Sequence, residues 1–280
     1  MKDILQHAPL NQRVAYIDKY DKGLLFPLKR QIKRDEIGIS NPLPFSGYDR
    51  WTAYELSWLN PKGKPEVAFG IFWIPCDSPC IIESKSLKLY LNSYNQTAFS
   101  SKEAVHDSLT LDLTEAAGAC VKVDLFDVSA QGEAQVMEPR VQGLLAGICL
   151  DKLDVVCTTY TVDPSLLSTS GHYVENHTVY SHLLKSNCLV TGQPDWGSLF
   201  IQYSGPHISE AALLQYVVSF RNHNEFHEQC VERIFSDLMR CCQLERLLVY
   251  ACYTRRGGID INPLRATEGV PHFYPGVLQR

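Results

Sequence analysis

The sequence predicts an α+β fold in which one unit of antiparallel strands and covering helices occurs twice. Patterns typical of strand, strand, helix, helix and strand follow one another over residues 51–126, and the same order returns over residues 178–253. The two copies keep a constant offset of 127 residues, at which Glu83 matches Glu210 and the closing strands coincide. A repeat in both order and spacing indicates a duplicated structural unit with helices packed on one face of each sheet.

The period of the apolar residues places the elements of each copy. The first copy is predicted to contain strands at 51–59, 67–74 and 120–126 and helices at 83–95 and from 101 onwards. Ser84 or Ser86 is the expected N-cap of its first helix. The second copy is predicted to contain strands at 178–185, 198–203 and 247–253, a helix capped by Ser209, and a longer helix from Phe226.

The chain is expected to divide into three segments. Residues 1–50 carry several prolines among scattered charges, which predicts an irregular N-terminal arm. Residues 51–150 form the first module and residues 151–280 the second. Glycines, prolines and short apolar runs over residues 129–176 predict a linker with one or two extra strands.

Composition excludes several classes of function. The chain of 280 residues has a net charge of -5 and no basic block, which argues against non-specific nucleic-acid binding. Neither a signal-peptide-like start nor a membrane-spanning apolar run is found. Ten cysteines at irregular spacing, two of them adjacent, predict free thiols and a cytoplasmic protein. Cys76 and Cys80 have no second pair at zinc spacing, so no metal site is predicted, and His106, His172 and His207 are expected to be surface or structural residues.

The loop between the first two strands of the second copy holds the most reactive pair of side chains. Cys188 and Asp195 lie seven residues apart in a polar stretch between two strand patterns. A thiolate can attack a carbon electrophile, and a nearby carboxyl group can transfer a proton. The alternative is that Cys188 is a small buried apolar residue and Asp195 an ordinary turn residue.

Other candidate residues are divided between the copies. Lys85 and Lys88 share a face near a helix N-terminus, which suits a phosphate, although a solvated lysine face paired with Glu83 explains them too. His227 and Glu228 open a helix of the second copy, where they can bind a purine-like base or simply interact with the helix dipole. Since neither copy holds the whole set, a site that uses all of them is expected to lie between the halves.

Four motifs in the same order and spacing resemble the NADPH-dependent 7-cyano-7-deazaguanine reductases, the nitrile reductases of queuosine biosynthesis. They are residues 83–90, residues 186–188 with 193–197, residues 224–228 and residues 255–263. The resemblance covers residues 15–265 and fits the long, duplicated form of that family. Each motif alone is weak, whereas the four together are specific.

The resemblance implies a tandem tunnelling fold and the reduction of a nitrile to a primary amine by two NADPH through a cysteine thioimide. Catalytic roles would fall to Cys188 as the nucleophile and Asp195 as the proton donor. The deazaguanine would be held by Ile82, Glu83, Ser84, His227 and Glu228. The residues implied for NADPH are Ser84, Lys85, Arg256 and Gly257. No G-x-G-x-x-G follows a strand, so a Rossmann-type site is not predicted.

Two other classes of function stay open at the level of sequence. One is a cyclohydrolase-like enzyme, although no metal-ligand set is found at suitable spacing. The other is a non-redox module that binds a purine or pterin and in which Cys188 is structural. The expected partner is the small-molecule substrate, with no direct nucleic-acid or membrane partner, and the expected assembly is a homodimer.

Overall fold

The computed structural model describes residues 17–129 and 147–267 and confirms the α+β prediction. The chain divides into two compact units. The first unit comprises Met1–Ser40, Tyr48–Glu138 and Arg255–Asp260. The second unit comprises Asn41–Gly47, Pro139–Thr254 and Ile261–Arg280. Each unit is described separately below, and each strand is assigned to the unit that holds most of its residues.

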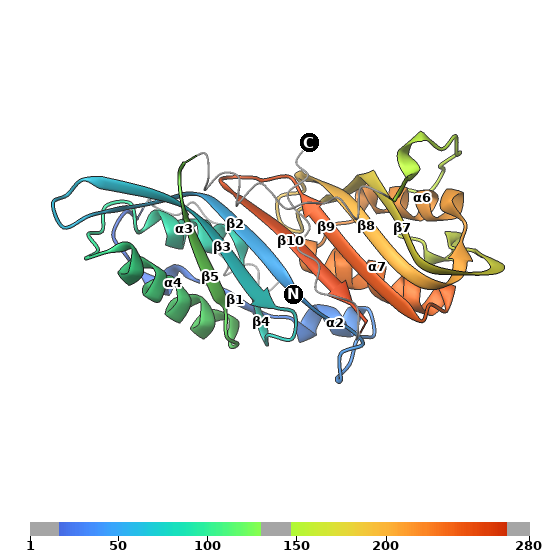
Figure 1. Ribbon diagram of the computed structural model, residues 1–280, viewed down its shortest axis with the longest axis horizontal. Helices are drawn as coiled ribbons and strands as arrows, with labels where there is room; N and C mark the ends of the chain where they lie inside the picture. Colours follow the sequence, from blue (N-terminus) through green and yellow to red (C-terminus); the bar gives the residue numbers. More distant parts are fainter. Residues whose placement is uncertain (1–16, 130–146, 268–280) are drawn as a thin grey trace. The chain divides into compact units, whose positions relative to one another are not determined.

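The first unit is built on an antiparallel sheet of β2 (Ser46–Leu59), β3 (Pro65–Pro75) and β5 (Lys122–Asp127), in the order β5-β3-β2. Helices α3 (Ser84–Asn92) and α4 (Lys102–Ala117) lie on one side of these strands (Figure 1). A short ladder joins β1 (Pro27–Lys29) to β4 (Cys80–Ile82). The predicted hairpin, two helices and closing strand are therefore confirmed.

The expectation of an irregular arm over residues 1–50 is wrong for much of its described part. Besides β1, this segment forms a 3-10 turn (Lys22–Leu24) and helix α2 (Gln31–Glu36), and β2 begins five residues before the predicted start. The buried Arg30 guanidinium lies 2.6 Å from the Asp49 carboxylate, and Arg34 donates to the Cys76 carbonyl at 2.6 Å. These long-range polar contacts hold a segment that has no apolar periodicity of its own.

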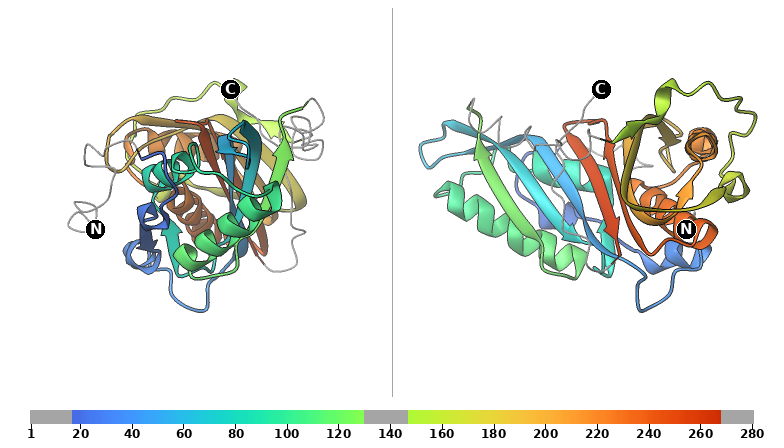
Figure 2. Two further views of the ribbon diagram at one scale, coloured as in Figure 1. Left: turned by 90° about the vertical axis from the view of Figure 1, so that its left-hand side faces the viewer. Right: turned by 45° about the vertical axis from the view of Figure 1, so that its right-hand side comes forward.

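The second unit contains β6 (Ile148–Cys149), β7 (Thr169–Asn187), β8 (Pro194–Ile208), β9 (Arg246–Tyr253) and β10 (Ile259–Ala266). Their order is β10-β9-β8-β7-β6, antiparallel except for the β6–β7 pair. Helices α6 (Glu210–Ser219) and α7 (His227–Cys242) lie beside these strands (Figure 2). The predicted order of elements is confirmed, and Ser209 caps α6 as expected.

One difference from the predicted second copy has a clear reason. Strand β10 is not predicted, because Gly257 and Gly258 directly before it and Pro263 within it give this stretch the composition of a loop. The extra strands expected in the linker are confirmed by β6 and by the start of β7, and 3-10 turns occur there at Leu150–Lys152 and Pro164–Leu166. Residues 130–146 of that linker lie outside the described residues.

The duplication extends to a buried hydrogen bond. In the first unit the Tyr90 hydroxyl on α3 donates to the Asp112 carboxylate on α4 at 2.6 Å. In the second unit the Tyr216 hydroxyl on α6 donates to the Asp237 carboxylate on α7 at 2.8 Å. Because a buried polar group needs a partner, the same tyrosine–aspartate pair links the two helices in each unit.

The thiol prediction is also confirmed. All ten cysteines are among the described residues, and none forms a disulfide. Within the described parts of the chain, every helix is too short or too polar to cross a membrane.

Candidate functional site

Cys188 lies in the turn that joins β7 to β8, as predicted. Its backbone N–H donates to the Gln193 carbonyl at 2.8 Å, and its own carbonyl accepts from Gly192 N–H at 3.0 Å. Gly192 has a φ of 67°, a left-handed conformation that glycine adopts without a steric penalty. The thiol is partly exposed, so a closed turn presents it to solvent from the ends of two paired strands.

The backbone hydrogen bonds of the corresponding turn in the first unit place Asn60 where Cys188 lies in the second, although the sequence offset of 127 residues pairs Cys188 with Pro61. Asn60 N–H donates to the Lys64 carbonyl at 2.9 Å, and the Asn60 carbonyl accepts from Gly63 N–H at 2.9 Å. The asparagine side chain closes the turn further, because its Oδ1 accepts from the N–H groups of Lys62 and Lys64. A thiol is a weak acceptor and is poorly suited to that role, which favours a chemical role for Cys188.

The residue before Cys188 is tied to the segment that leads into α7. Asn187 N–H donates to the His223 carbonyl at 2.8 Å, and Glu225 N–H donates to the Asn187 carbonyl at 3.1 Å. Lys185, which sequence reasoning missed, donates to Asn187 Oδ1 at 2.6 Å. Burial lowers the pKa of Lys185, and Arg221 adds to this effect. These bonds fix the position of the Cys188 turn relative to the first turn of α7.

His227, the first residue of α7, contacts Asp195 at the start of β8. Its Nε2 lies 3.4 Å from Asp195 Oδ2, and both side chains are largely buried. The imidazole also stacks on Tyr253 with ring centroids 3.8 Å apart and planes inclined by 10°. His227 Nδ1 is buried and has no hydrogen-bond partner among the residues that the structure describes. A buried nitrogen of this kind is a strong candidate for a ligand contact.

Two further residues of this region are notable for their burial. Glu228, the second residue of α7, is only 2% exposed, and Tyr253 is 1% exposed. A carboxylate in the first turn of α7 also interacts favourably with the helix dipole, which is the alternative role that the sequence analysis gives for Glu228. Tyr253 was seen in the sequence only as the end of a strand, and no pattern indicated that its ring faces His227.

In the first unit Glu83 is the N-cap of α3, so the prediction that Ser84 or Ser86 caps this helix is wrong. The Glu83 carboxylate accepts from Lys85 N–H at 2.7 Å and from Ser86 N–H at 2.8 Å. The Ser86 hydroxyl instead donates to the Glu83 carbonyl. Burial raises the pKa of Glu83, and the two backbone N–H groups and the charges of Lys88 and Lys85 oppose that rise.

The turn before β10 packs against α3 and β2 within the same unit. Gly257 has a φ of 60°, and a Cβ there would lie 3.4 Å from the side chain of Lys88. Tyr54 N–H donates to the Gly258 carbonyl at 2.9 Å, and the Tyr54 hydroxyl donates to Asp260 Oδ2 at 2.6 Å. The structure thus brings the Gly257 turn to Lys88 of α3, which the sequence had placed with Lys85 on one face of that helix.

Profiles of two protein families match the chain. The family described as "Nitrile reductase, 7-cyano-7-deazaguanine-reductase N-term" matches residues 16–125, and the family described as "QueF-like protein" matches residues 194–270. A protein of Azoarcus sp. strain BH72, called NADPH-dependent 7-cyano-7-deazaguanine reductase, is 55% identical over 93% of this chain and 91% of its own length. A protein of the same name from Aromatoleum aromaticum is 56% identical over 95% of this chain and 93% of its own.

The chain belongs to the 7-cyano-7-deazaguanine reductase family. A third relative, from Chromobacterium violaceum, is 53% identical over 93% of this chain and 92% of its own length. The matched profiles of this reductase family include Glu83, Asp195 and His227, whereas Cys188 lies between the two matched ranges. The crystal structure of the archaeosine synthase QueF-Like in the apo form matches 36% of this chain and 99% of its own, with a TM-score of 0.31 and 15% identity.

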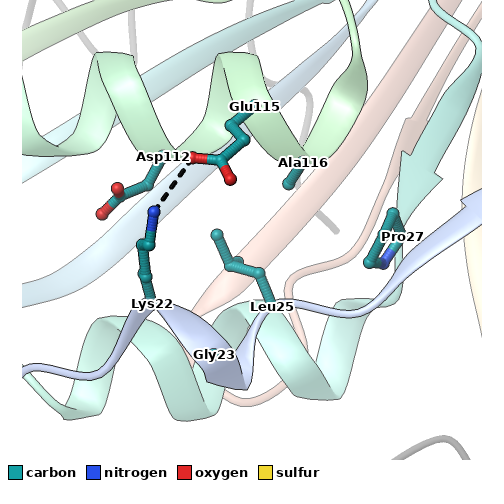
Figure 3. A pocket seen from close by; sticks show the side chains of 7 residues that line it. All are labelled: Lys22, Gly23, Leu25, Pro27, Asp112, Glu115 and Ala116. Atoms are coloured by element: carbon teal, nitrogen blue, oxygen red, sulfur yellow. Dashed lines mark hydrogen bonds and ion pairs between the residues drawn. The ribbon is translucent and has the colours of Figure 1, made fainter.

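One cavity of the first unit contains none of the predicted site residues. It has a volume of about 250 Å³ and lies between the segment around Lys22 and helix α4 (Figure 3). The Lys22 ammonium group and the Glu115 carboxylate pair across it at 3.1 Å. Both side chains are more than half exposed, so this ion pair contributes little stability, and no cysteine, serine or threonine lines the cavity.

Proposed function

We propose that this chain reduces the nitrile of 7-cyano-7-deazaguanine to the aminomethyl group with NADPH, through a thioimide on Cys188, in queuosine biosynthesis. The observation that supports this best is the position of Cys188. A partly exposed thiol lies in a closed turn whose preceding residue is bonded to the segment entering α7. That helix begins with His227 and Glu228, and His227 contacts Asp195.

The chemistry needs a nucleophile and a proton donor at opposite ends of the nitrile. The Cys188 thiolate adds to the carbon and breaks one C–N π bond while Asp195 delivers a proton to nitrogen, which gives a neutral thioimide. Hydride from one NADPH then reaches the thioimide carbon. Loss of the thiolate leaves an imine, and hydride from a second NADPH with a further proton completes the primary amine.

The base-recognition role in the second unit is supported by two buried groups. His227 Nδ1 has no hydrogen-bond partner among the described residues, and a donor or acceptor at the edge of the deazaguanine would supply one. The buried Glu228 carboxylate is suited to accept N–H bonds from the same base.

The roles proposed for Ile82, Glu83 and Ser84 rest on their sequence motif. Each Glu83 oxygen accepts one backbone N–H of α3 and, as a carboxylate oxygen, can accept a second donor. The cap therefore does not prevent Glu83 from binding a ligand N–H.

Phosphate groups of NADPH are assigned to the basic residues of the first unit. Ser84 and Lys85 lie in the first turn of α3, where the Ser84 hydroxyl and the Lys85 ammonium group can bind a phosphate, while the backbone N–H groups of Lys85 and Ser86 are taken by Glu83. Arg256 and Gly257 lie in the turn that packs against Lys88. Because a left-handed glycine leaves the backbone uncovered, a phosphate can approach it closely.

Replacing Lys85 with alanine is expected to raise the Michaelis constant for NADPH far more than that for the nitrile. The lost charge-assisted contact is worth about 1.5–3 kcal/mol, or roughly 10- to 150-fold in affinity. Steady-state kinetics with each substrate varied in turn measure both constants. Lys62→Ala, in an exposed turn of the same unit, is the matched control and should leave both constants unchanged. A weakened nitrile constant with a normal NADPH constant would assign Lys85 to the substrate instead.

Replacing Glu228 with alanine is expected to weaken formation of the Cys188 adduct although the thiol remains. A buried donor of the base loses its acceptor, at a cost of about 1–3 kcal/mol. The concentration of nitrile that half-saturates adduct formation, followed by intact mass without NADPH, measures this loss. Glu228→Gln keeps the shape and one acceptor oxygen, so it should be less affected.

The expectation that residues of both units bind one substrate molecule stays a prediction. The Glu83→Ala variant tests it. It should also weaken the adduct, and thermal unfolding is measured in parallel because the α3 cap is lost. A fragment from residue 150 onwards that folds and binds the nitrile normally would contradict this prediction.

One assay separates the proposed reaction from the two alternatives. The protein is mixed with NADPH and 7-cyano-7-deazaguanine, and absorbance of the reduced nicotinamide is followed together with the mass of the product. A reductase consumes two NADPH per amine formed. A cyclohydrolase-like enzyme changes the ring without NADPH, and a binding module changes neither. The expected homodimer and cytoplasmic location are further parts of the proposal, and sedimentation analysis tests the first of them.

A further inference from the structure

Three potential metal ligands converge in the second unit, away from the Cys188 turn. His177 lies on β7, His207 on β8, and Glu210 is the first residue of α6. The Glu210 Oε1 atom lies 3.0 Å from His207 Nε2 and 3.9 Å from His177 Nε2. One ligand atom from each of the three residues lies within 4.8 Å of the others.

Hydrogen bonding inside the protein explains only part of this cluster. The 3.0 Å contact between His207 and Glu210 is an ordinary hydrogen bond. His177 Nε2, in contrast, is buried and has no hydrogen-bond partner among the described residues. Its distance of 3.9 Å to the Glu210 carboxylate is too long for a hydrogen bond. A buried nitrogen directed at a carboxylate and a second imidazole therefore lacks a partner that a cation would provide.

The surroundings of His207 resemble the outer shell of a metal ligand. The Ser170 hydroxyl lies 3.3 Å from His207 Nδ1, the nitrogen on the far side of the ring from Glu210. Such a contact holds the orientation of a ligating imidazole. His172 stacks on the same ring at a centroid distance of 4.5 Å, and its Nδ1 lies 2.9 Å from Ser170.

Comparison of the two units shows why the Glu210 carboxylate is available. Glu83, its counterpart in the repeat, is the N-cap of α3, and both of its oxygens accept backbone N–H groups. In the second unit Ser209 takes over the capping role, and its hydroxyl accepts from Ala212 N–H. The carboxylate of Glu210 is therefore not needed by its own helix and faces the two histidines.

We propose that His177, His207 and Glu210 form a binding site for a divalent transition-metal ion of the Zn²⁺ class. Two imidazoles and one carboxylate are a common ligand set for Zn²⁺. Bonds of about 2.1 Å in a tetrahedral complex separate ligand atoms by about 3.4 Å, within the range spanned by the three residues.

Metal binding at this place has a structural consequence. The three ligands come from two adjacent strands and the start of the helix that follows them. An ion held by all three would stabilise the folded second unit, because the unfolded chain offers no preformed site. The ligand side chains are 17–28% exposed, so an ion can reach them from solvent.

The test uses the full-length protein after treatment with a chelator. Co²⁺ is titrated as a spectroscopic substitute for Zn²⁺, and Zn²⁺ is then used to displace it. We expect one equivalent of bound Co²⁺ with d–d bands of a nitrogen and oxygen ligand set and no thiolate charge-transfer band. The absence of that band separates this site from the ten thiols of the chain. Zn²⁺ should also raise the midpoint of thermal unfolding.

Three variants and one control decide the assignment. His177→Ala, His207→Ala and Glu210→Gln should each weaken Co²⁺ binding by more than about tenfold, equivalent to about 1.4 kcal/mol. His106→Ala changes a partly exposed histidine of the first unit and should bind as the wild type does. Circular dichroism shows which variants are folded, and the folded ones are compared. Undiminished binding in folded variants, a thiolate band, or no binding at micromolar Co²⁺ would overturn the proposal.

Discussion

Replacement of Cys188 with alanine is expected to abolish nitrile reduction and covalent labelling while leaving the fold intact. Without the thiol no thioimide forms, and the nitrile itself is a poor hydride acceptor, so the turnover number should fall by several orders of magnitude. The turn does not depend on the thiol for closure, because the backbone bonds of residue 188 to Gln193 and Gly192 remain in the variant. NADPH oxidation and intact mass after incubation with the nitrile alone measure the two losses.

The other cysteines provide the control for this experiment. Cys120 and Cys241 are exposed, and their alanine variants should keep full activity and the full mass increase. Cys230 is buried, and burial raises the pKa of its thiol to about 12, which leaves little thiolate at neutral pH. Peptide mapping that places the adduct on any cysteine other than Cys188 would contradict the assignment.

The second large effect is expected for Asp195→Asn. Removing a proton donor typically slows the assisted step by about 10²- to 10⁴-fold, so formation of the adduct should slow by that factor. Asparagine has nearly the same size, and the chain should fold normally. Rapid-quench mass spectrometry of the first turnover follows adduct formation directly.

A parallel measurement distinguishes the role of the Cys188 thiol from that of the Asp195 carboxyl group. Alkylation of Cys188 by iodoacetamide should keep a rate close to that of the wild type in Asp195→Asn, because this reaction needs no proton donor. Asp154→Asn changes an exposed carboxylate of the same unit and serves as the matched control. Adduct formation at the normal rate in Asp195→Asn would assign the proton transfer to another group.

Much of the fold follows from the sequence because each copy carries strong periodic patterns. Apolar spacing predicts helices at 83–95 and from 101, and α3 and α4 lie within these stretches. The N-terminal segment was not predictable in the same way. Its helix α2 is held by buried arginines that pair with distant residues, and such contacts leave no local period.

The candidate site, like the fold, could be predicted from the sequence only where local patterns determine it. The turn of Cys188 could be predicted because two strand patterns enclose it, and His227 because it opens a helix. The stacking of His227 on Tyr253 and the approach of Gly257 to Lys88 join residues far apart in the chain. The convergence of His177 with His207 and Glu210 depends likewise on strand register, which sequence spacing does not reveal.

The two equivalent turns differ in how a side chain takes part in closing them. In the first unit the Asn60 side chain accepts from the N–H groups of Lys62 and Lys64. In the second unit the backbone of residue 188 bonds to Gln193 and Gly192, and these bonds do not depend on the type of side chain at that position. A duplicated unit can therefore change this residue while the strands on either side keep their pairing. Under the proposed function, this is the position at which the second copy gained its nucleophile.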